Sequence, residues 1–335
     1  MDLAKFIASL LIIAIHTTPL FFINESANFI LVHIIARLAV PFFFISSGFF
    51  LKSKINDFQS TKKYVFKLLK IYIVWTVIYL PIVLFEQPQL RSMTPSAIIF
   101  FIKELIFAGS YYHLWYLTTS IFAVVLIYFS LKVVDAKKLF FAALLLFFAG
   151  LLGDSYFGIF ELFFKSGTKL YALLDIYFVN FITTRNGLFF GFLFILIGIL
   201  IKSRVHQNKK VCIIGLTVSL VFLFSEVLLL EHFTAPKDYN MYFSLVPASF
   251  FLFSLLIQIK LPDKKYFYTL RQMSLLIFLS HLLFKFLFDR LSLLSAVFEN
   301  PLLCFFFVAF LSILFSLCII KLETKKGFAW LKILH

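Results

Sequence analysis

Apolar runs of about 20 residues, the length that an α-helix needs to cross a lipid bilayer, recur along nearly the whole chain. Of its 335 residues, 62% are hydrophobic, 14% are charged and 50 are phenylalanine. A water-soluble domain covers its core with side chains that water solvates, and this composition leaves too few of them. The sequence therefore predicts an all-α, polytopic integral membrane protein whose helices form a bundle in the lipid bilayer.

Ten membrane spans follow from the apolar runs. They are expected near 3–23, 29–51, 68–87, 114–134, 139–153, 181–201, 211–230, 241–260, 272–290 and 301–321. The run AIIFFIKELIFA, residues 97–108, is interrupted by Lys103 and Glu104, which favours an interfacial or re-entrant helix over an eleventh span. No internal repeat or flexible linker is visible, so residues 1–335 are interpreted as one domain.

The basic residues indicate the orientation. Of the 31 lysines and arginines, 22 are Lys5 or lie in the segments 52–70, 132–138, 202–210, 260–271 and 321–332. Positive residues concentrate on the cytoplasmic side of membrane proteins, which puts both termini in the cytoplasm. The connections 88–113 and 154–180, on the other side, are long and aromatic. They would either form an external lid or acceptor site or simply cover the bundle.

Two classes of site are excluded by the same patterns. The net charge of +15 is distributed in short clusters between apolar runs, not in one basic patch, which argues against nucleic acid as a partner. The three cysteines, Cys212, Cys304 and Cys318, lie in apolar runs without paired spacing. We therefore expect neither a metal site nor a disulfide framework.

A polar stripe runs along the first span. At 100° per residue, Lys5, Ser9, Ile12 and His16 fall within about 60° of one another, and Asp2 joins the lower edge of the stripe. Lipid would leave these polar groups unsatisfied, so the stripe must face protein or water. The alternative for His16 is a purely structural imidazole, bonded to a backbone carbonyl.

Arg37 is the most unusual residue of the second span. At about 1.5 Å per residue, His16 lies roughly 16 Å from Lys5 toward the outer side of the membrane. The second span runs back from the outer side, and Arg37 lies about 12 Å along it from residue 29, so His16 and Arg37 are expected at a similar depth. A cation inside a bilayer is costly and persists mainly where it pairs or functions. Arg37 therefore either shares a cavity with His16 or pairs structurally with a carboxylate such as Glu226.

Other spans carry further candidate polar sites. They comprise Ser46 and Ser47 before Gly48 in VPFFFISSGFF, His113 in YYHLWYL, Arg185 and Asn186 about one turn inside the sixth span, Glu226 in the seventh, and the stripe Arg271, Ser274, His281 and Lys285 in the ninth. Each has a structural alternative. The serines and Gly48 are typical of close helix packing, His113 of an interfacial aromatic belt, Arg185 of an ion pair, and Lys285 of snorkelling to the membrane surface.

Several of these motifs together resemble the acyltransferase-3 family of ten-span membrane proteins. They are D-x-x-K followed by His16, then Arg37, VPFFFISSGFF, YHLWYL and SHLLF. Within that family, GDSYFG, TRNGLFFG and SEVLLLEHFTAPKDYNMYFSLVP resemble the membrane part of the membrane-bound serine and alanine racemases of vancomycin-resistant bacteria, the VanT type. The resemblance extends over nearly the whole chain.

The family resemblance implies an enzyme that transfers an acyl group from cytoplasmic acyl-CoA, with acetyl-CoA as the expected donor, to a small-molecule acceptor on the outer side. His16 would be the catalytic base. Lys5, where many family members have arginine, would stand where CoA enters, and Ser9, Ser46 and Ser47 would line the acyl-CoA path. A neutral imidazole suits this role near physiological pH, and Arg37 would stabilise the oxyanion.

The racemase resemblance implies a second function. In such proteins a cytosolic racemase domain, which holds pyridoxal phosphate, follows the membrane part, and the membrane part is assigned to L-serine uptake in the bacterial plasma membrane. We expect that domain to lie outside this chain, which ends at KLETKKGFAWLKILH. In transport, Arg37 or Arg185 would bind the serine carboxylate and Glu226 its ammonium group. A membrane anchor with a vestigial site is a third interpretation, and a homodimer is left open.

Overall fold

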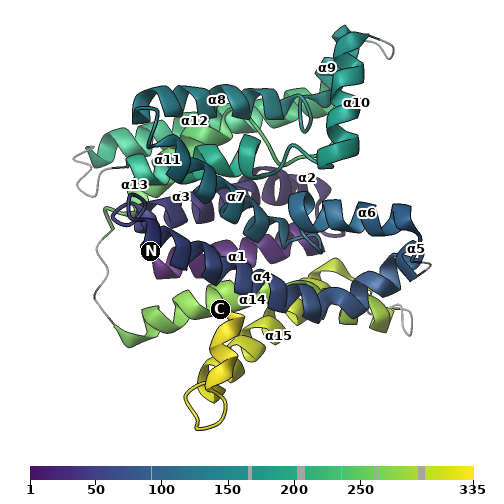
Figure 1. Ribbon diagram of the computed structural model, residues 1–335, viewed down its shortest axis with the longest axis vertical. Coiled ribbons are helices and arrows are strands. Elements are labelled where there is room, and N and C mark those ends of the chain that lie inside the picture. The colour runs from purple at the N-terminus through teal and green to yellow at the C-terminus, as the bar shows by residue number, and fades with distance from the viewer. Residues whose placement is uncertain are drawn as a thin grey trace. The chain divides into compact units, whose positions relative to one another are not determined.

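A computed structural model describes residues 1–91, 93–164, 168–201, 208–234, 236–259, 262, 264–292 and 299–335. Those residues form helices and connections and contain no strand (Figure 1), which confirms the all-α prediction for them. The helices are α1 (Asp2–Thr17), α2 (Glu25–Ile30), η1 (Leu31–Ile35), η2 (Ala36–Leu38), α3 (Ala39–Leu51), α4 (Phe58–Glu86), α5 (Pro88–Arg91), α6 (Pro95–Lys103), η3 (Glu104–Ala108), α7 (Trp115–Ser130), α8 (Ala136–Leu151), α9 (Phe157–Phe163), α10 (Lys169–Phe181), η4 (Gly187–Gly191), α11 (Phe192–Leu200), α12 (Lys209–Phe233), α13 (Leu245–Leu256), α14 (Lys265–Ser292), α15 (Pro301–Leu322) and η6 (Ala329–Leu334).

Each of the ten predicted spans overlaps a described helix or a run of helices. Four described helical stretches are long and apolar enough to cross a membrane: Glu25–Leu51, Phe58–Glu86, Lys209–Phe233 and Pro301–Leu322. Shorter apolar stretches lie at Trp115–Ser130, Gly187–Leu200 and Leu245–Leu256. The count of ten and the cytoplasmic termini stay predictions. Some basic residues behind that orientation, Lys165, Lys202, Arg204 and Lys260, lie outside the described residues.

Helix ends differ from the predicted ones where local chemistry decides them. α1 stops at Thr17 although the apolar run continues to residue 23, because Pro19 follows and disfavours helical backbone at Thr18, which adopts φ 45°. In the connection 154–180, which we interpreted only as a long external loop, the chain forms α9 and α10. The Thr168 hydroxyl caps α10 by accepting a hydrogen bond from the Tyr171 backbone N–H.

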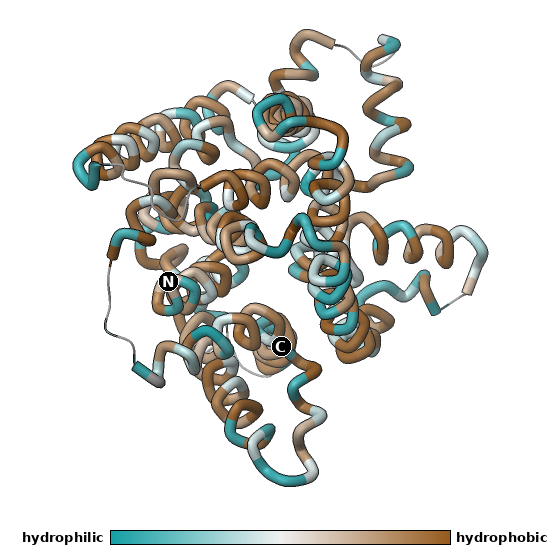
Figure 2. The backbone as a smooth tube through the Cα atoms, turned by 60° about the vertical axis from the view of Figure 1, so that its left-hand side comes forward, coloured by the Kyte–Doolittle hydropathy of each residue, from teal (hydrophilic) through white to brown (hydrophobic). Residues whose placement is uncertain are grey.

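Apolar side chains cover the outside of many helices. Figure 2 shows hydrophobic residues along most of the helical tube, with hydrophilic ones mainly at helix ends and connections. On α12, Val221 and Phe222 are both largely exposed. Water would not favour such faces, whereas lipid does, so the exposed surface supports the membrane interpretation.

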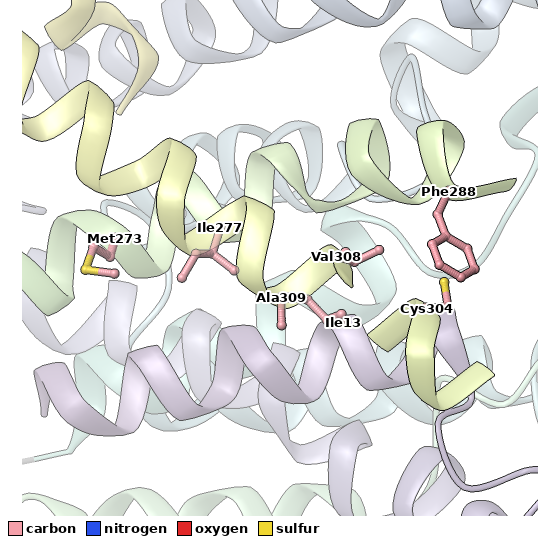
Figure 3. Close-up of a cluster of buried hydrophobic side chains, with 7 residues drawn as sticks. All are labelled: Ile13, Met273, Ile277, Phe288, Cys304, Val308 and Ala309. Atoms are coloured by element: carbon pink, nitrogen blue, oxygen red, sulfur yellow. The ribbon is translucent and has the colours of Figure 1, made fainter. Parts of the chain in front are cut away.

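The chain divides into two compact units, one formed by 1–43 with 255–335 and the other by 44–254. In the first unit, α1 packs against α14 and α15. Figure 3 shows the core between these three helices, which consists of Ile13, Met273, Ile277, Phe288, Cys304, Val308 and Ala309. Whether residues 1–335 act as one domain stays a prediction.

In the second unit, α7 and η4 pack together and contact α4, α8 and α11. The helices α3 and α11 approach each other closely. A Cβ atom built on Gly48 would lie 2.0 Å from the Ile195 carbonyl oxygen, and one built on Gly198 would lie 2.0 Å from the Ile45 carbonyl oxygen. The two backbones are therefore in contact at these positions, because glycine has no side chain to separate them. This assigns to Gly48 the packing role that we considered for it.

Candidate functional site

The predicted stripe of α1 is turned toward protein. Ser9 and Ile12 are buried, while Lys5 and His16 are half-buried. The Ser9 hydroxyl donates a 2.7 Å hydrogen bond to the Phe6 carbonyl oxygen one turn earlier, so its proton is already engaged within the helix. Helical periodicity thus predicted the common face, and tertiary packing buries its middle.

His16 lies beside His281 of α14. The two ring centroids are 5.2 Å apart and the rings are tilted by 40°. His281 is fully buried, and its Nδ1 lies 2.7 Å from the Phe278 carbonyl oxygen. A carbonyl can only accept, so this contact assigns a proton to Nδ1. The sequence put these histidines in two separate stripes, and the fold brings them together.

The same two helices carry an ion pair near their N-terminal ends. Arg271 donates from Nε and Nη2 to the two carboxylate oxygens of Asp2, each at 2.9 Å, which is the bidentate geometry. Lys5 interacts electrostatically with both groups. α1 and α14 therefore run parallel from a charged cluster at one end to the histidine pair farther along. Periodicity placed Asp2 and Arg271 on stripes but could not pair them.

Arg37 lies in an irregular part of its helix, in the same unit as His16. The five residues of η1 form a π-helix and the three of η2 a 3₁₀-helix between the α-helical turns of α2 and α3. Both short elements pack against α1. Such irregular turns inside a helix often occur at functional sites, because they redirect side chains. Arg37 itself is half-buried.

Ser46 and Ser47 belong to the second unit. Ser46 is buried, and the Ser47 hydroxyl lies 3.2 Å from the hydroxyl of Tyr116 on α7. The hydroxyl of Ser47 thus meets a tyrosine of the YHLWYL motif, a partner that the sequence did not suggest. His113, in the same motif, is buried and meets Tyr79 edge-on, with the ring centroids 5.0 Å apart.

Arg185 and Asn186 lie outside the helix in which we placed them. The helical chain begins only at Gly187, because Asn186 caps it: its Oδ1 accepts from the backbone N–H groups of Leu188 and Phe189. The expectation of helical backbone at Arg185 is therefore wrong, while its depth in the membrane stays a prediction. Its guanidinium lies over the Trp115 ring, 4.8 Å from the centroid, and Nη1 is 3.6 Å from Asp238.

Glu226 holds a segment of backbone. Its Oε1 accepts from the Tyr156 hydroxyl and from the Phe243 N–H, both at 2.6 Å, and its Oε2 accepts from the Ser244 N–H at 2.8 Å. Three donors satisfy this carboxylate within the protein. On α14, Lys285 pairs with Asp289 at 2.7 Å, one turn later, instead of only snorkelling.

Asp154 holds a segment of backbone in the same way as Glu226. We noted this residue only as part of the string GDSYFG and did not predict a role for it. Its Oδ1 accepts from the backbone N–H groups of Asn240 and Met241, both at 2.9 Å. Burial raises the pKa of Asp154 to about 6, and repulsion from Asp238 adds to this, while Arg185 and the two N–H donors oppose it. The three racemase-like strings thus meet in one hydrogen-bonded cluster of the second unit. No group of three potential metal ligands lies among the described residues.

Comparison with known proteins finds three relatives. A protein named amino-acid racemase from Enterococcus faecalis is 36% identical over 261 residues, 77% of this chain and 36% of that protein. One named serine/alanine racemase from Enterococcus gallinarum is 32% identical over 270 residues, covering 77% of this chain and 37% of that protein. A second amino-acid racemase from Enterococcus faecalis is 29% identical over 97% of this chain and 46% of that protein. The chain spans less than half the length of these relatives, and no solved structure matches it.

The family comparison extends over more of the chain than two of the relatives do. The model of the acyltransferase domain, acyltransferase-3, matches residues 1–321. That range contains α1 with Lys5 and His16, the irregular helix with Arg37, and α14 with Arg271 and His281. Since the match covers nearly all of the sequence, the chain belongs to the acyltransferase-3 family.

Proposed function

We propose that this chain is a membrane acyltransferase domain in which His16 is the general base. The observation that carries the proposal is the pairing of His16 with the fully buried His281, 5.2 Å away, on two helices that also share the Asp2–Arg271 ion pair. A half-buried imidazole beside a second, oriented imidazole is suited to moving a proton. The family membership supplies the class of reaction.

The reaction would begin when His16 takes the proton from the hydroxyl or amine of the acceptor. The acceptor atom attacks the thioester carbonyl carbon, and its bond to that carbon forms while negative charge develops on the carbonyl oxygen. The C–S bond then breaks, and the CoA thiolate takes the proton back from His16. Arg37, on the turns that pack against α1, would stabilise the oxyanion.

Lys5 would meet the phosphates of CoA. It stands beside Asp2 and Arg271, and Arg271 is half-exposed, so this end of α1 and α14 offers positive charge to an anionic donor. About 16 Å separates Lys5 from His16 along the helix, which a pantetheine arm can span. Acetyl-CoA is the donor that we propose.

The test is binding and turnover of acetyl-CoA by the purified chain in lipid vesicles. Calorimetry should detect acetyl-CoA binding to the wild type and a loss of affinity in Lys5→Ala. Thiol release in the presence of candidate acceptors should vanish in His16→Ala but persist in His232→Ala, which removes an exposed histidine of α12. No binding at millimolar acetyl-CoA, or full turnover by His16→Ala, would overturn the proposal.

L-serine uptake is the second candidate function, favoured by the racemase names of the relatives and by the surroundings of Arg185. Its guanidinium lies 3.6 Å from the Asp238 carboxylate, which is longer than a direct hydrogen bond, and Asp238 is half-exposed. The carboxylate of a zwitterion could therefore bind Arg185 while its ammonium group binds Asp238. Asp238 suits the ammonium better than Glu226, which already accepts three hydrogen bonds. Serine accumulation in vesicles that is lost in Arg185→Gln and unchanged in His16→Ala would establish this function instead.

We further propose that the chain works in a bacterial plasma membrane with both termini in the cytoplasm. A racemase domain, fused or associated, would hold pyridoxal phosphate on that side, and the pair would serve vancomycin resistance. The support is the length and the names of the relatives. Protease treatment of intact cells that carry tagged termini tests this topology. Cleavage of either tag by protease added outside the cells would contradict it.

A further inference from the structure

The segment directly after α15 folds into a small structure with two distinct sides. Gly327, at φ 94°, forms a turn, and residues 329–334 then form the 3₁₀-helix η6. Side chains three residues apart align on such a helix. Leu331 and Leu334 share one edge, which is buried, while Trp330 and Ile333 share the next edge, which is exposed.

Polar contacts hold residues 327–335 against α14 and α15 in the first unit. The Nε2 of His335 lies 2.7 Å from Glu323 Oε2, and both side chains are almost buried, 11% and 7% exposed. Gln272 of α14 donates to the other oxygen of Glu323 at 3.2 Å. Figure 1 shows the chain turning back beside α15 in this way, with its C-terminal end next to α14. The orientation of the exposed edge is therefore fixed by packing and by hydrogen bonds.

The exposed side of the segment combines aromatic, apolar and positive groups. Trp330 is 63% exposed, and Phe328 and Ile333 are exposed as well. Around them the exposed charges are Lys321, Lys325, Lys326 and Lys332. Glu323 is the single acid between 321 and 335, all of which is described, and its carboxylate is occupied by His335 and Gln272. The exposed charged side chains of residues 321–335 are thus all positive.

The position of the segment is set by the helix before it. α15 is one of the helices long and apolar enough to cross a membrane, and it ends at Leu322. If α15 spans the membrane, residues 325–333 lie near its surface. Tryptophan favours the level of the lipid headgroups, and lysines beside a span are attracted by anionic lipids. Exposed Trp330 and Ile333 would enter the headgroup layer, while the lysines meet its charge.

We propose that Lys325, Lys326, Lys332 and Trp330 form a binding surface for anionic lipid headgroups, which seats the end of α15 and α14 at the membrane surface. The charge complementarity selects this partner over zwitterionic lipid. Because Gln272 is next in sequence to Arg271, the surface is attached to the same helix that carries the Asp2–Arg271 pair. The proposal concerns lipid binding and holds whether or not the chain transfers acyl groups.

The test uses the fluorescence of Trp330, which is the single exposed tryptophan, since Trp75 and Trp115 are buried. The chain is placed in vesicles that contain brominated phosphatidylglycerol or brominated phosphatidylcholine at equal mole fraction. The difference between wild type and Trp330→Phe isolates the Trp330 signal. We expect the brominated anionic lipid to quench that signal more strongly at low salt, and the preference to shrink in 1 M salt, where the screening length is about 3 Å.

The matched variants separate this surface from a general charge effect. Removing lysines by Lys325→Gln, Lys326→Gln and Lys332→Gln should lower the relative affinity for anionic lipid about fivefold for each, which corresponds to about 1 kcal/mol per charge. Lys137→Gln with Lys138→Gln, at the start of α8, should leave it unchanged. Equal quenching by both lipids at low salt would overturn the proposal. So would the absence of quenching by either lipid, which would mean that water or a protein partner covers Trp330.

Discussion

The imidazole rings of His16 and His281 lie 5.2 Å apart between centroids, and the Nδ1 of His281 is directed at the Phe278 carbonyl oxygen, 2.7 Å away. One ring is therefore fixed by its own helix and the other lies beside it, half-buried. This asymmetry suggests different roles. His16 would exchange the proton, and His281 would keep its neighbour oriented.

The substitution His281→Asn tests that difference. An asparagine amide can still donate to the Phe278 carbonyl, but it removes the second ring nitrogen and the ring surface beside His16. We expect acetyl-CoA turnover to fall by about 10- to 100-fold, because a misplaced catalytic group loses rate without losing the fold. The Michaelis constant should stay unchanged, and His232→Asn should have no effect. Full turnover by His281→Asn would contradict the positioning role.

Asp2→Asn should strengthen the binding of acyl-CoA. The Asp2 carboxylate neutralises Arg271 through two 2.9 Å bonds and lies near Lys5, so removing its charge makes this end of α1 and α14 more positive. A unit charge a few ångströms away in water is worth roughly 1 kcal/mol, or about fivefold in the dissociation constant. Calorimetry at low salt measures this, with Asp175→Asn as a control on α10. Weaker binding would show that Arg271 needs Asp2 in order to be held in place.

Much of the helical architecture could be predicted from the sequence, because apolar runs of span length have few other stable solutions. The residues at which helices begin and end were harder to predict from the sequence. The helix containing Leu188 begins where Asn186 caps it, and α1 ends where Pro19 follows. Such ends depend on single capping residues and on proline, which hydropathy averages conceal.

The candidate site was predictable only within one helix. Periodicity placed Lys5 and His16 on one face, since that requires nothing but the 3.6-residue repeat. The contacts of His16 with His281 and of Asp2 with Arg271 join segments more than 260 residues apart, and no local pattern encodes them. Asp154 was missed for another reason: its partners are backbone N–H groups, which leave no trace in the sequence.

The glycine contact between α3 and α11 predicts a large stability effect from a single methyl group. Gly48→Ala and Gly198→Ala would each bring a Cβ to 2.0 Å from a backbone oxygen, so the helices must move apart. We expect each to destabilise the protein by about 1–3 kcal/mol. In Gly215→Ala the added atom meets the ring of Phe251 instead of backbone, and a side chain can turn aside. Thermal unfolding in detergent should rank Gly215→Ala as the mildest, and equal midpoints for all three would contradict this account.

Asp154 should make the stability of the protein depend on pH. Burial raises the pKa of Asp154 to about 6 in the folded state, above the ordinary value that it regains on unfolding. Between those two values the folded protein binds the proton more tightly, so the contribution to stability is fully present below the ordinary pKa and is lost as the pH rises through about 6. The wild type should therefore gain stability, about 1–1.5 kcal/mol from this group, when the pH falls from 7.5 to 5.

The variant Asp154→Asn isolates that contribution. An asparagine oxygen can still accept from the N–H groups of Asn240 and Met241, but it carries no charge at any pH. The difference between the unfolding midpoints at pH 5 and pH 7.5 should therefore be smaller in Asp154→Asn than in the wild type, although other groups titrate in both. At pH 7.5 the variant should be at least as stable as the wild type, because it no longer buries a carboxylate beside Asp238. Asp154→Ala, which leaves two buried N–H groups without an acceptor, should be less stable than both at every pH. A variant Asp154→Asn with the same pH dependence as the wild type would assign the effect to another group.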